Sequence, residues 1–440
     1  MVNYHGMLEW ASALVKGKMA GMKILRFGVL LALLALGVAD AAKPPPAKAA
    51  QPVVDITLRH ALQGSARDAL GKLVERFNAA QKGQGRIVLE DLPAEGEARR
   101  LPQLALLDLD DSLAFFHTLP RFKPLYKAMA EAGEKFDAAQ FLPLIAEAVD
   151  DPAGRIQALP LGLALPVLLW NKDALTKAGL GPNPPTKTWL QVQNLAGQLY
   201  DAGQRCPLTS SRFTWVHLEN LSSQHGEPVS ARDAKGVMRL VLNRMVDVKH
   251  LSLLASWQKS HYFHYYGRAD EADRKFLSGE CAMLTGASSV AVLARDAGFA
   301  LGMGPLPHYD DVYGVVPDKL LPDGAALWLL AGNSKAEDKL AARFVAFLLQ
   351  PALQREWVKA SGYLPMSAGA LEAVADAGAT RRLLANKSGA ARAKPGYALA
   401  RQREILAEEL ETVWRNDKPP MAALNDAMRR INEEAAKAQP

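Results

Sequence analysis

A strand, an amphipathic helix and a second strand follow one another where the regular pattern of this chain begins. Residues 53–58 and 86–92 have the apolar, β-branched composition of strands. Between them, apolar side chains recur at helical spacing, namely at Leu70, Leu73, Val74 and Phe77. This order predicts a right-handed crossover joining two parallel strands, which is the building unit of α/β folds.

The same alternation returns near the other end of the chain. Residues 325–330 form an apolar run of strand length, and helical stripes follow at Leu340, Phe344, Phe347 and Leu348, then at Leu406, Leu410, Val413 and Trp414. No tandem repeat of solenoid length is present. A chain of 440 residues is long enough for two lobes with separate cores. Because no linker divides it, lobes built from discontinuous segments fit at least as well as two consecutive domains.

The N-terminal region has the pattern of a secretory signal. A basic start at residues 22–26 precedes an apolar run at 27–38, and Ala39-Asp40-Ala41 has the small residues that a signal peptidase recognises. We therefore expect a signal peptide at residues 22–41, cleaved after about Ala41, with the start at Met1 or Met22 left open. An uncleaved anchor is the competing interpretation, but the run falls short of the roughly 20 residues that a spanning helix needs.

The Pro- and Ala-rich segment 42–52 is expected to be an extended tether. The net charge of +6 comes from basic residues spread along the chain, without basic runs interleaved with aromatic residues. This distribution argues against a nucleic-acid partner. Cys206 and Cys281 are the two cysteines. In an exported chain they form either one disulfide or two buried thiols, and their spacing does not decide between these alternatives.

Motifs of catalysis are absent from the sequence. It contains no nucleophile elbow, zinc-protease motif, phosphate-binding loop or dinucleotide fingerprint. His261 and His264 have no third ligand nearby, so we expect neither a metal nor a cofactor.

Nine sequence blocks resemble the periplasmic sn-glycerol-3-phosphate-binding proteins, within the extracellular solute-binding proteins of ABC importers. The chain carries PVLLWNKDALTKAGL from Pro166, PPTKTW from Pro184 and HLENLSSQHG from His217, and further blocks are FNA from Phe77, KPLY from Lys123, FLSGECAM from Phe276, ALW from Ala326, SGYLP from Ser361 and EELETVW from Glu408. They run in family order from about Val53 to the C-terminus.

The resemblance implies a two-lobed periplasmic binding protein fold of α/β class. Each lobe is a mixed sheet flanked by helices, and hinge strands join the discontinuous lobes. We assign residues 53–164 and 322–358 to the N-terminal lobe, and 165–321 and 359–440 to the C-terminal lobe. The ligand is expected between the lobes, where pockets form preferentially.

The resemblance also implies ligand-binding residues. Arg403 matches an arginine that meets the phosphate, and a guanidinium suits two phosphate oxygens. Tyr363 supplies a hydroxyl, Gly324 permits close backbone approach, and Trp215 packs on the carbon skeleton. Asp110 replaces a glutamate that accepts hydroxyl hydrogen bonds, and His60 is a further expected ligand-binding residue.

Several positions depart from the family pattern. Ala164 and Ala287 replace ligand-contacting serines, Ser288 lies beside the latter as a substitute, and Arg59 and Arg212 replace tryptophans. The two arginines are either extra phosphate partners or solvated side chains.

The sequence therefore predicts a binding protein, not an enzyme. It is expected to act in the periplasm as a monomer that passes a small molecule to inner-membrane ABC permease subunits with their ATPase. The predicted ligand is sn-glycerol-3-phosphate or a glycerophosphodiester. An uncharged sugar or polyol, or a secreted hydrolase activity, is the alternative.

Overall fold

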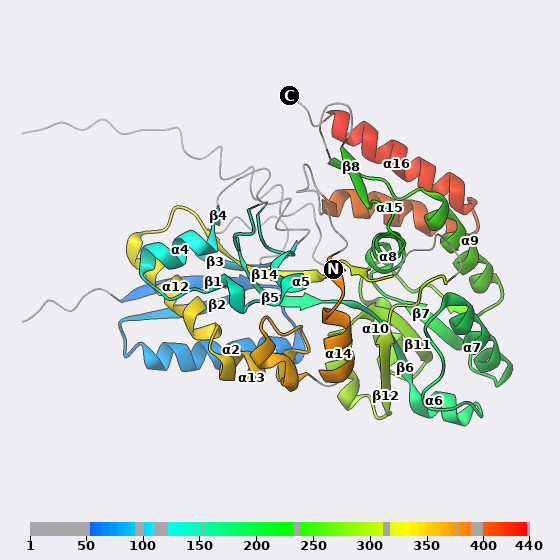
Figure 1. Ribbon diagram of the computed structural model, residues 1–440, viewed down its shortest axis with the longest axis horizontal. Coiled ribbons are helices and arrows are strands. Elements are labelled where there is room, and N and C mark those ends of the chain that lie inside the picture. Colours follow the sequence, from blue (N-terminus) through cyan, green and yellow to red (C-terminus); the bar gives the residue numbers. More distant parts are fainter. Residues whose placement is uncertain are drawn as a thin grey trace, which may run out of the picture.

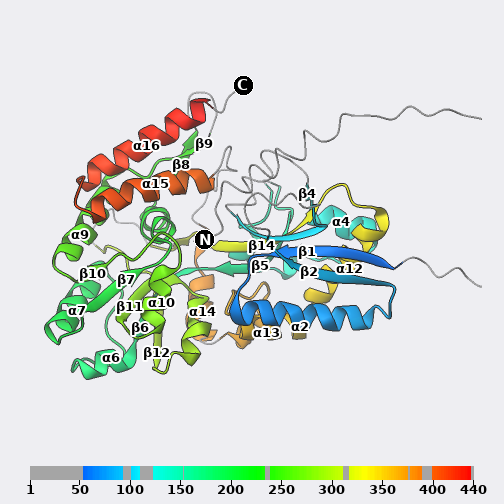
Figure 2. The same cartoon turned by 180° about the vertical axis from the view of Figure 1, so that it is seen from behind.

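The computed structural model describes residues 53–92, 101–109, 122–151, 153–232, 238–310, 317–374, 377–388 and 399–437. The signal and tether predicted at 22–52 lie outside these residues. Two α/β lobes lie side by side, each built on its own sheet (Figures 1 and 2). The predicted fold class, a two-lobed mixed α/β protein, is confirmed. No helix among the described residues is long and apolar enough to span a membrane.

The N-terminal lobe has a sheet of six strands within the described residues. Its order is β2 (Gly85–Asp91), β1 (Val54–His60), β3 (Leu104–Asp108), β14 (Asp323–Leu330) and β4 (Phe122–Lys123), with β5 (Leu159–Ala164) also on β14. The predicted crossover is confirmed, because β1 and β2 are parallel and joined through a helix. The helices are α2 (Gly64–Ala80), α4 (Leu125–Ala132), α5 (Pro143–Ala146), α12 (Lys335–Leu348) and α13 (Pro351–Ser361). Helix α14 (Ala377–Leu384) contacts the turn at Ala368–Ala373 and also the strand Leu301–Pro305 of the other sheet.

The C-terminal lobe has a sheet of five strands within the described residues, in the order β10 (Phe263–His264), β7 (Cys206–Ser210), β11 (Cys281–Ala287), β6 (Pro166–Asn171) and β12 (Leu301–Pro305). Its helices are α6 (Lys172–Lys177), α7 (Trp189–Asp201), α8 (Asn220–Gln224), α9 (Met245–Lys259), α10 (Glu271–Leu277), α11 (Val290–Leu293), α15 (Leu399–Trp414) and α16 (Pro420–Lys437). A π-helix, Thr214–Glu219, leads into α8.

Minor elements complete the lobes. Two short strand pairs are β8 (Ser230–Arg232) with β9 (Met238–Leu240), and β13 (Lys319–Leu320) with β15 (Lys387–Ser388). Short 3-10 turns lie at Ala138–Gln140, Ala294–Asp296 and Ala368–Ala373.

Local sequence explains where several helices begin and end. Ser334 and Glu337 form a capping box at the start of α12, and each satisfies a backbone N–H that would otherwise lack a partner. Helix α13 begins with Pro351, whose missing N–H costs nothing in the first turn. It ends at Gly362, which adopts the left-handed conformation that such a terminus requires.

Two apolar clusters form the cores, and β6 contributes to both. Val167 and Leu169 belong to the cluster centred on the N-terminal sheet, whereas Leu168 and Trp170 belong to the cluster of the C-terminal lobe. Alternation of this kind follows from the two-residue period of a strand. The helical stripes predicted from the sequence are buried, apart from the half-buried Phe347. The predicted lobe boundaries stay a prediction, and the one after residue 358 lies inside α13.

Cys206 and Cys281 form a disulfide between neighbouring strands β7 and β11. Their Cα atoms are 4.5 Å apart, within the range that a disulfide spans. The alternative of two free thiols is therefore wrong.

Candidate functional site

Arg403 lies on α15 and is held by two carboxylates from distant parts of the chain. Its Nε and Nη2 donate to the two oxygens of Glu219 at 2.5 and 2.6 Å. Its Nη1 donates to Asp323 Oδ2 at 2.7 Å. The three side chains are only 13%, 5% and 6% exposed, respectively. The residue predicted to meet a phosphate is thus already charge-paired in this conformation.

Arg212 differs from Arg403 in both exposure and pairing. Its side chain is exposed and makes no ion pair with any carboxylate in the described part of the chain. Desolvation by the surrounding protein tends to lower the pKa of the Arg212 guanidinium. The negative charges of Asp108 and Asp323 outweigh this effect, so the pKa is raised. Its φ is +49°, a conformation that costs energy for a residue with a Cβ and is often found at functional sites.

Asp108 ends β3 and faces this cluster from the N-terminal lobe. Desolvation raises the pKa of its carboxyl, and the charges of Arg212 and Arg403 partly oppose that rise. The side chain is nevertheless exposed to solvent. Asp108 was not among the residues predicted from the sequence, although an acidic residue directly after the apolar run 104–107 was a signal for it.

Tyr363 joins the same group of charges. Burial raises the pKa of its hydroxyl, with a further rise from Asp108 and an opposing effect from Arg212. Its ring stacks on Trp357 with the centroids 6.0 Å apart. The structure therefore brings together three of the predicted residues, Arg212, Tyr363 and Arg403, and joins to them the carboxylates of Asp108, Asp323 and Glu219.

Trp215 and Ser288 contact the segments that cross between the lobes. Trp215 is 3% exposed, and its Nε1 donates to the carbonyl of Leu321 at 2.8 Å. The hydroxyl of Ser288 accepts from the N–H of Leu165 at 3.1 Å. Packing of the Trp215 ring on a ligand stays a prediction.

Gly324 is required by strand packing. Its φ is +125°, and a Cβ there would lie 2.2 Å from the carbonyl oxygen of Gly162 on β5. Its own N–H donates to Asp323 Oδ1 at 2.9 Å. Approach of a ligand to Gly324 stays a prediction, and Asp110 lies outside the described residues.

Arg59 and His60 lie at the carboxyl end of β1. Arg59 Nε donates to Glu90 at 2.9 Å, so its charge is paired. His60 is 2% exposed and lines a pocket of about 460 Å³ between α2 and β2. Burial is the largest cause of the lowered pKa of His60. Their roles in binding stay predictions, and this pocket is lined by none of the residues around Arg212.

Among the described residues, no group of three or more His, Cys, Asp or Glu side chains is arranged to hold a metal ion. The site instead offers two guanidinium groups, carboxylates and one phenol. Such groups bind and orient a polar solute through hydrogen bonds. Two α/β lobes with these side chains between them define a two-lobed binding protein.

Comparisons with known proteins agree with this class. The family model described as "Bacterial extracellular solute-binding protein" matches residues 72–381, so the chain belongs to that family. The sn-glycerol-3-phosphate-binding periplasmic protein UgpB of Pectobacterium atrosepticum is 33% identical over 411 residues, which cover 87% of this chain and 91% of that protein. The family predicted from the sequence is confirmed.

Solved structures share the fold at low identity. UgpB from Mycobacterium tuberculosis in complex with glycerophosphocholine has a TM-score of 0.69 at 17% identity and covers 88% of this chain and 99% of its own. The ABC substrate-binding protein Lmo0181 from Listeria monocytogenes in complex with cycloalternan has a TM-score of 0.70 at 16% identity and covers 87% and 99%. These relatives are binding proteins by name.

Proposed function

We propose that the protein binds an anionic glycerol derivative, sn-glycerol-3-phosphate or a glycerophosphodiester, between its lobes. It delivers this ligand in the periplasm, as a monomer, to ABC permease subunits with their ATPase. The curated relative at 33% identity is named for sn-glycerol-3-phosphate, which supports the ligand class.

The observation that carries the proposal is the exposed guanidinium of Arg212, which forms no ion pair within the described residues and lies beside Tyr363 and Asp108. A guanidinium donates two parallel hydrogen bonds to a phosphoryl group. The hydroxyls of glycerol are suited to the carboxylate of Asp108, which accepts hydrogen bonds.

Charge balance favours the diester within this class. Asp108, Asp323 and Glu219 bring three carboxylates against the two guanidinium groups of Arg212 and Arg403. A phosphomonoester carries up to two negative charges at neutral pH, and a phosphodiester carries one. The smaller charge meets less repulsion from the carboxylates.

Isothermal titration tests the proposal with sn-glycerol-3-phosphate, glycerophosphocholine and maltose. We expect the two phosphate esters to bind and maltose not to bind. Tight binding of maltose with no response to either ester would overturn the proposal. An uncharged sugar is the second candidate, because the donors of Arg403 are paired and a solved structure of this fold holds cycloalternan.

A further inference from the structure

Helix α2 and strand β2 enclose a pocket of about 460 Å³ on the N-terminal lobe. The two elements are neighbours in Figures 1 and 2, and β2 pairs only with β1 among the described residues. The volume lies within the range of sites for small molecules. None of the residues around Arg212 lines this pocket, so it shares no residue with the site between the lobes.

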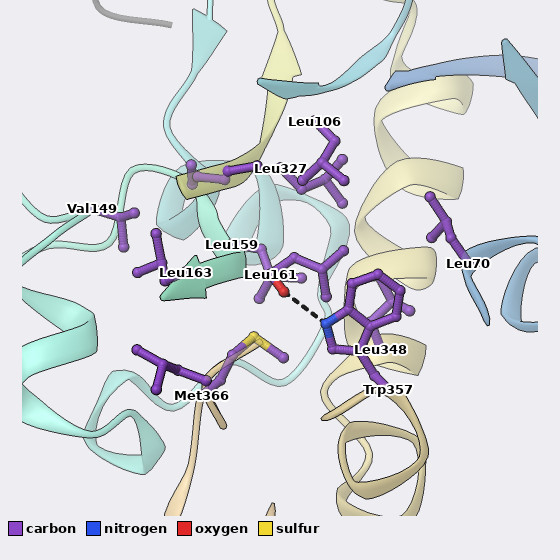
Figure 3. Close-up of a cluster of buried hydrophobic side chains, with 14 of the residues drawn as sticks. Leu70, Leu106, Val149, Leu159, Leu161, Leu163, Leu327, Leu348, Trp357 and Met366 are labelled. Carbon is purple, nitrogen blue, oxygen red and sulfur yellow. Dashed lines mark hydrogen bonds between the residues drawn. The ribbon is translucent and has the colours of Figure 1, made fainter. Parts of the chain in front are cut away.

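Helix α2 turns one face to the core and another to the pocket. Leu70 is fully buried in the apolar cluster that Figure 3 shows. The helix residues that line the pocket recur three or four positions apart and so share a face, namely Arg67, Asp68, Gly71, Lys72 and Glu75. At Gly71, a Cβ would meet no atom within 4 Å beyond its neighbours in the helix. The missing side chain of Gly71 therefore leaves room in the pocket.

His60 lines the pocket with a buried ring nitrogen that has no hydrogen-bond partner. The residue is 2% exposed, and its Nδ1 lies 4.0 Å from Oδ1 of Asp91, which also lines the pocket. That separation is too long for a hydrogen bond. Burial is the largest cause of the lowered pKa of His60, so its imidazole is neutral at pH 7 and can accept a hydrogen bond. A ligand that donates to Nδ1 would remove the cost of burying this atom without a partner.

The charges around the pocket are mostly negative. Four of the lining residues are acidic and two are basic. Two of the carboxylates are already paired. Arg67 Nη2 donates to Asp91 Oδ2 at 2.8 Å, and Arg59 Nε, from outside the lining, donates to Glu90 at 2.9 Å. The pairing of Asp91 through Oδ2 leaves its Oδ1 directed toward His60.

The other two lining carboxylates lie on α2. Asp68 and Glu75 form no ion pair or hydrogen bond with any other residue in the described part of the chain. Lys72 is the basic lining residue that remains to offset their two charges. The pocket therefore keeps a net negative charge, which attracts a cation.

We propose that this pocket binds a small organic cation that carries a primary ammonium group. Because His60 Nδ1 and Asp91 Oδ1 are 4.0 Å apart, one ammonium nitrogen can lie at hydrogen-bond distance from both atoms. An ammonium group has three N–H donors and no acceptor, which suits a site of carboxylates and one neutral imidazole. The half-buried Leu89 lines the pocket and packs against the carbon chain of the ligand. The inference is independent of the proposed function.

Isothermal titration at pH 7.5 tests the proposal with 1,4-diaminobutane, 1,4-butanediol and tetramethylammonium chloride. The diol keeps the carbon chain of the diamine but has no charge, and tetramethylammonium keeps a charge but has no N–H donor. We expect the diamine to bind with a stoichiometry of one, the diol not to bind, and tetramethylammonium to bind at least about 10-fold more weakly than the diamine. No binding of the diamine, or equally tight binding of either comparison compound, would overturn the proposal.

Asp91→Asn tests the carboxylate beside His60. The variant removes the charge but keeps the size of the side chain, and it should weaken diamine binding about 10-fold or more, because a charge-assisted hydrogen bond is lost. Glu147→Gln is the matched control, since Glu147 is an exposed carboxylate of the same lobe that does not line the pocket. It should change the affinity less than about 2-fold, because solvent and salt screen such a charge. Equal losses in the two variants, or no loss in Asp91→Asn, would overturn the site.

Gly71→Leu and Gly71→Ala test the space in the pocket. Leucine and alanine are both better helix formers than glycine, so the pair separates filling of the pocket from any change in the stability of α2. We expect Gly71→Leu to abolish diamine binding and Gly71→Ala, which adds a single methyl group, to retain it. Circular dichroism checks that both variants fold. Wild-type affinity in a folded Gly71→Leu would overturn the proposal.

Competition separates this pocket from the site between the lobes. Saturating sn-glycerol-3-phosphate should leave the affinity for the diamine unchanged, because the two sites share no lining residue. Displacement of the diamine by the phosphate ester would place the diamine between the lobes and overturn the separate pocket. Failure of both phosphate esters to bind would overturn the proposed function alone.

Discussion

The N-terminal lobe packs Phe77 against Phe344 and Phe347, whereas the C-terminal lobe packs Trp189 against His217 and His250. In the C-terminal core, the two imidazoles hydrogen-bond each other at 2.9 Å. His217 also contacts the hydroxyl of Thr285, and His250 contacts that of Tyr309, each at 2.8 Å. Apolar packing of the first kind is insensitive to pH. The comparison leads us to expect redox sensitivity, and the larger part of the pH sensitivity, in the C-terminal lobe.

The largest expected difference between the lobes concerns the disulfide. It closes a loop of 75 residues in the C-terminal lobe. By restricting the unfolded chain, a loop of that length contributes about 4 kcal/mol to the free energy of unfolding. The double variant Cys206→Ala and Cys281→Ala should lose stability of that order. Urea unfolding measures the loss, and hydrogen exchange should locate it in β7 and β11. Equal loss of protection in α2 would contradict the separation of the lobes.

Acidification should destabilise the C-terminal lobe next most strongly. Burial lowers the pKa of His217 to about 3 and that of His225 to about 4. The unfolded chain therefore binds more protons than the folded chain. The two histidines leave the free energy of unfolding undiminished above pH 6.5 and lower it as the pH falls from 6.5 toward their folded-state pKa values. At pH 5 each of these histidines lowers the free energy of unfolding by about 2 kcal/mol.

Asp247 partly opposes this loss. Burial raises the pKa of its carboxyl to about 6, so the folded state binds the additional proton between pH 4 and 6. The net loss at pH 5 should be a few kcal/mol. Urea unfolding at pH 7.5 and 5.0, with hydrogen exchange in each lobe, measures it. A C-terminal lobe as stable at pH 5.0 as at pH 7.5 would contradict the prediction.

Ligand affinity should also depend more on the C-terminal lobe. Arg212→Ala should weaken phosphate-ester binding about 10- to 100-fold, because a hydrogen bond to a charged group contributes about 1.5 to 3 kcal/mol. Tyr363→Phe, at a ring that stacks on Trp357 of α13 in the N-terminal lobe, should weaken it less than 10-fold, because a neutral hydroxyl contributes about 1 kcal/mol. Arg415→Ala removes an exposed arginine directly after α15 as a control. Isothermal titration measures the affinity of the three variants. A larger loss of affinity in Tyr363→Phe than in Arg212→Ala would contradict the prediction.

The helices and strands could be predicted from the sequence because the spacing of apolar residues along the chain is a local signal. Leu70, Leu73, Val74 and Phe77 mark the buried face of α2 by their spacing alone. The site depended on contacts between remote residues. Arg403 was identified through the family resemblance, but its partners Glu219 and Asp323 lie 184 and 80 positions away. No sequence periodicity indicates pairing between such distant residues, so the ion pairs of Arg403 could be identified only in the folded chain.

The smallest expected effect concerns the indole of Trp357 in the N-terminal lobe. Trp357→Phe keeps an aromatic ring in the apolar cluster but removes the hydrogen bond to the carbonyl of Leu161. A buried hydrogen bond of this kind contributes about 1 kcal/mol, so urea unfolding should show a loss of that order. Because no titrating group is removed, the loss should be equal at pH 7.5 and 5.0. A loss that grows on acidification would mean that the N-terminal core is coupled to the C-terminal histidines, and the lobes would then unfold as one unit.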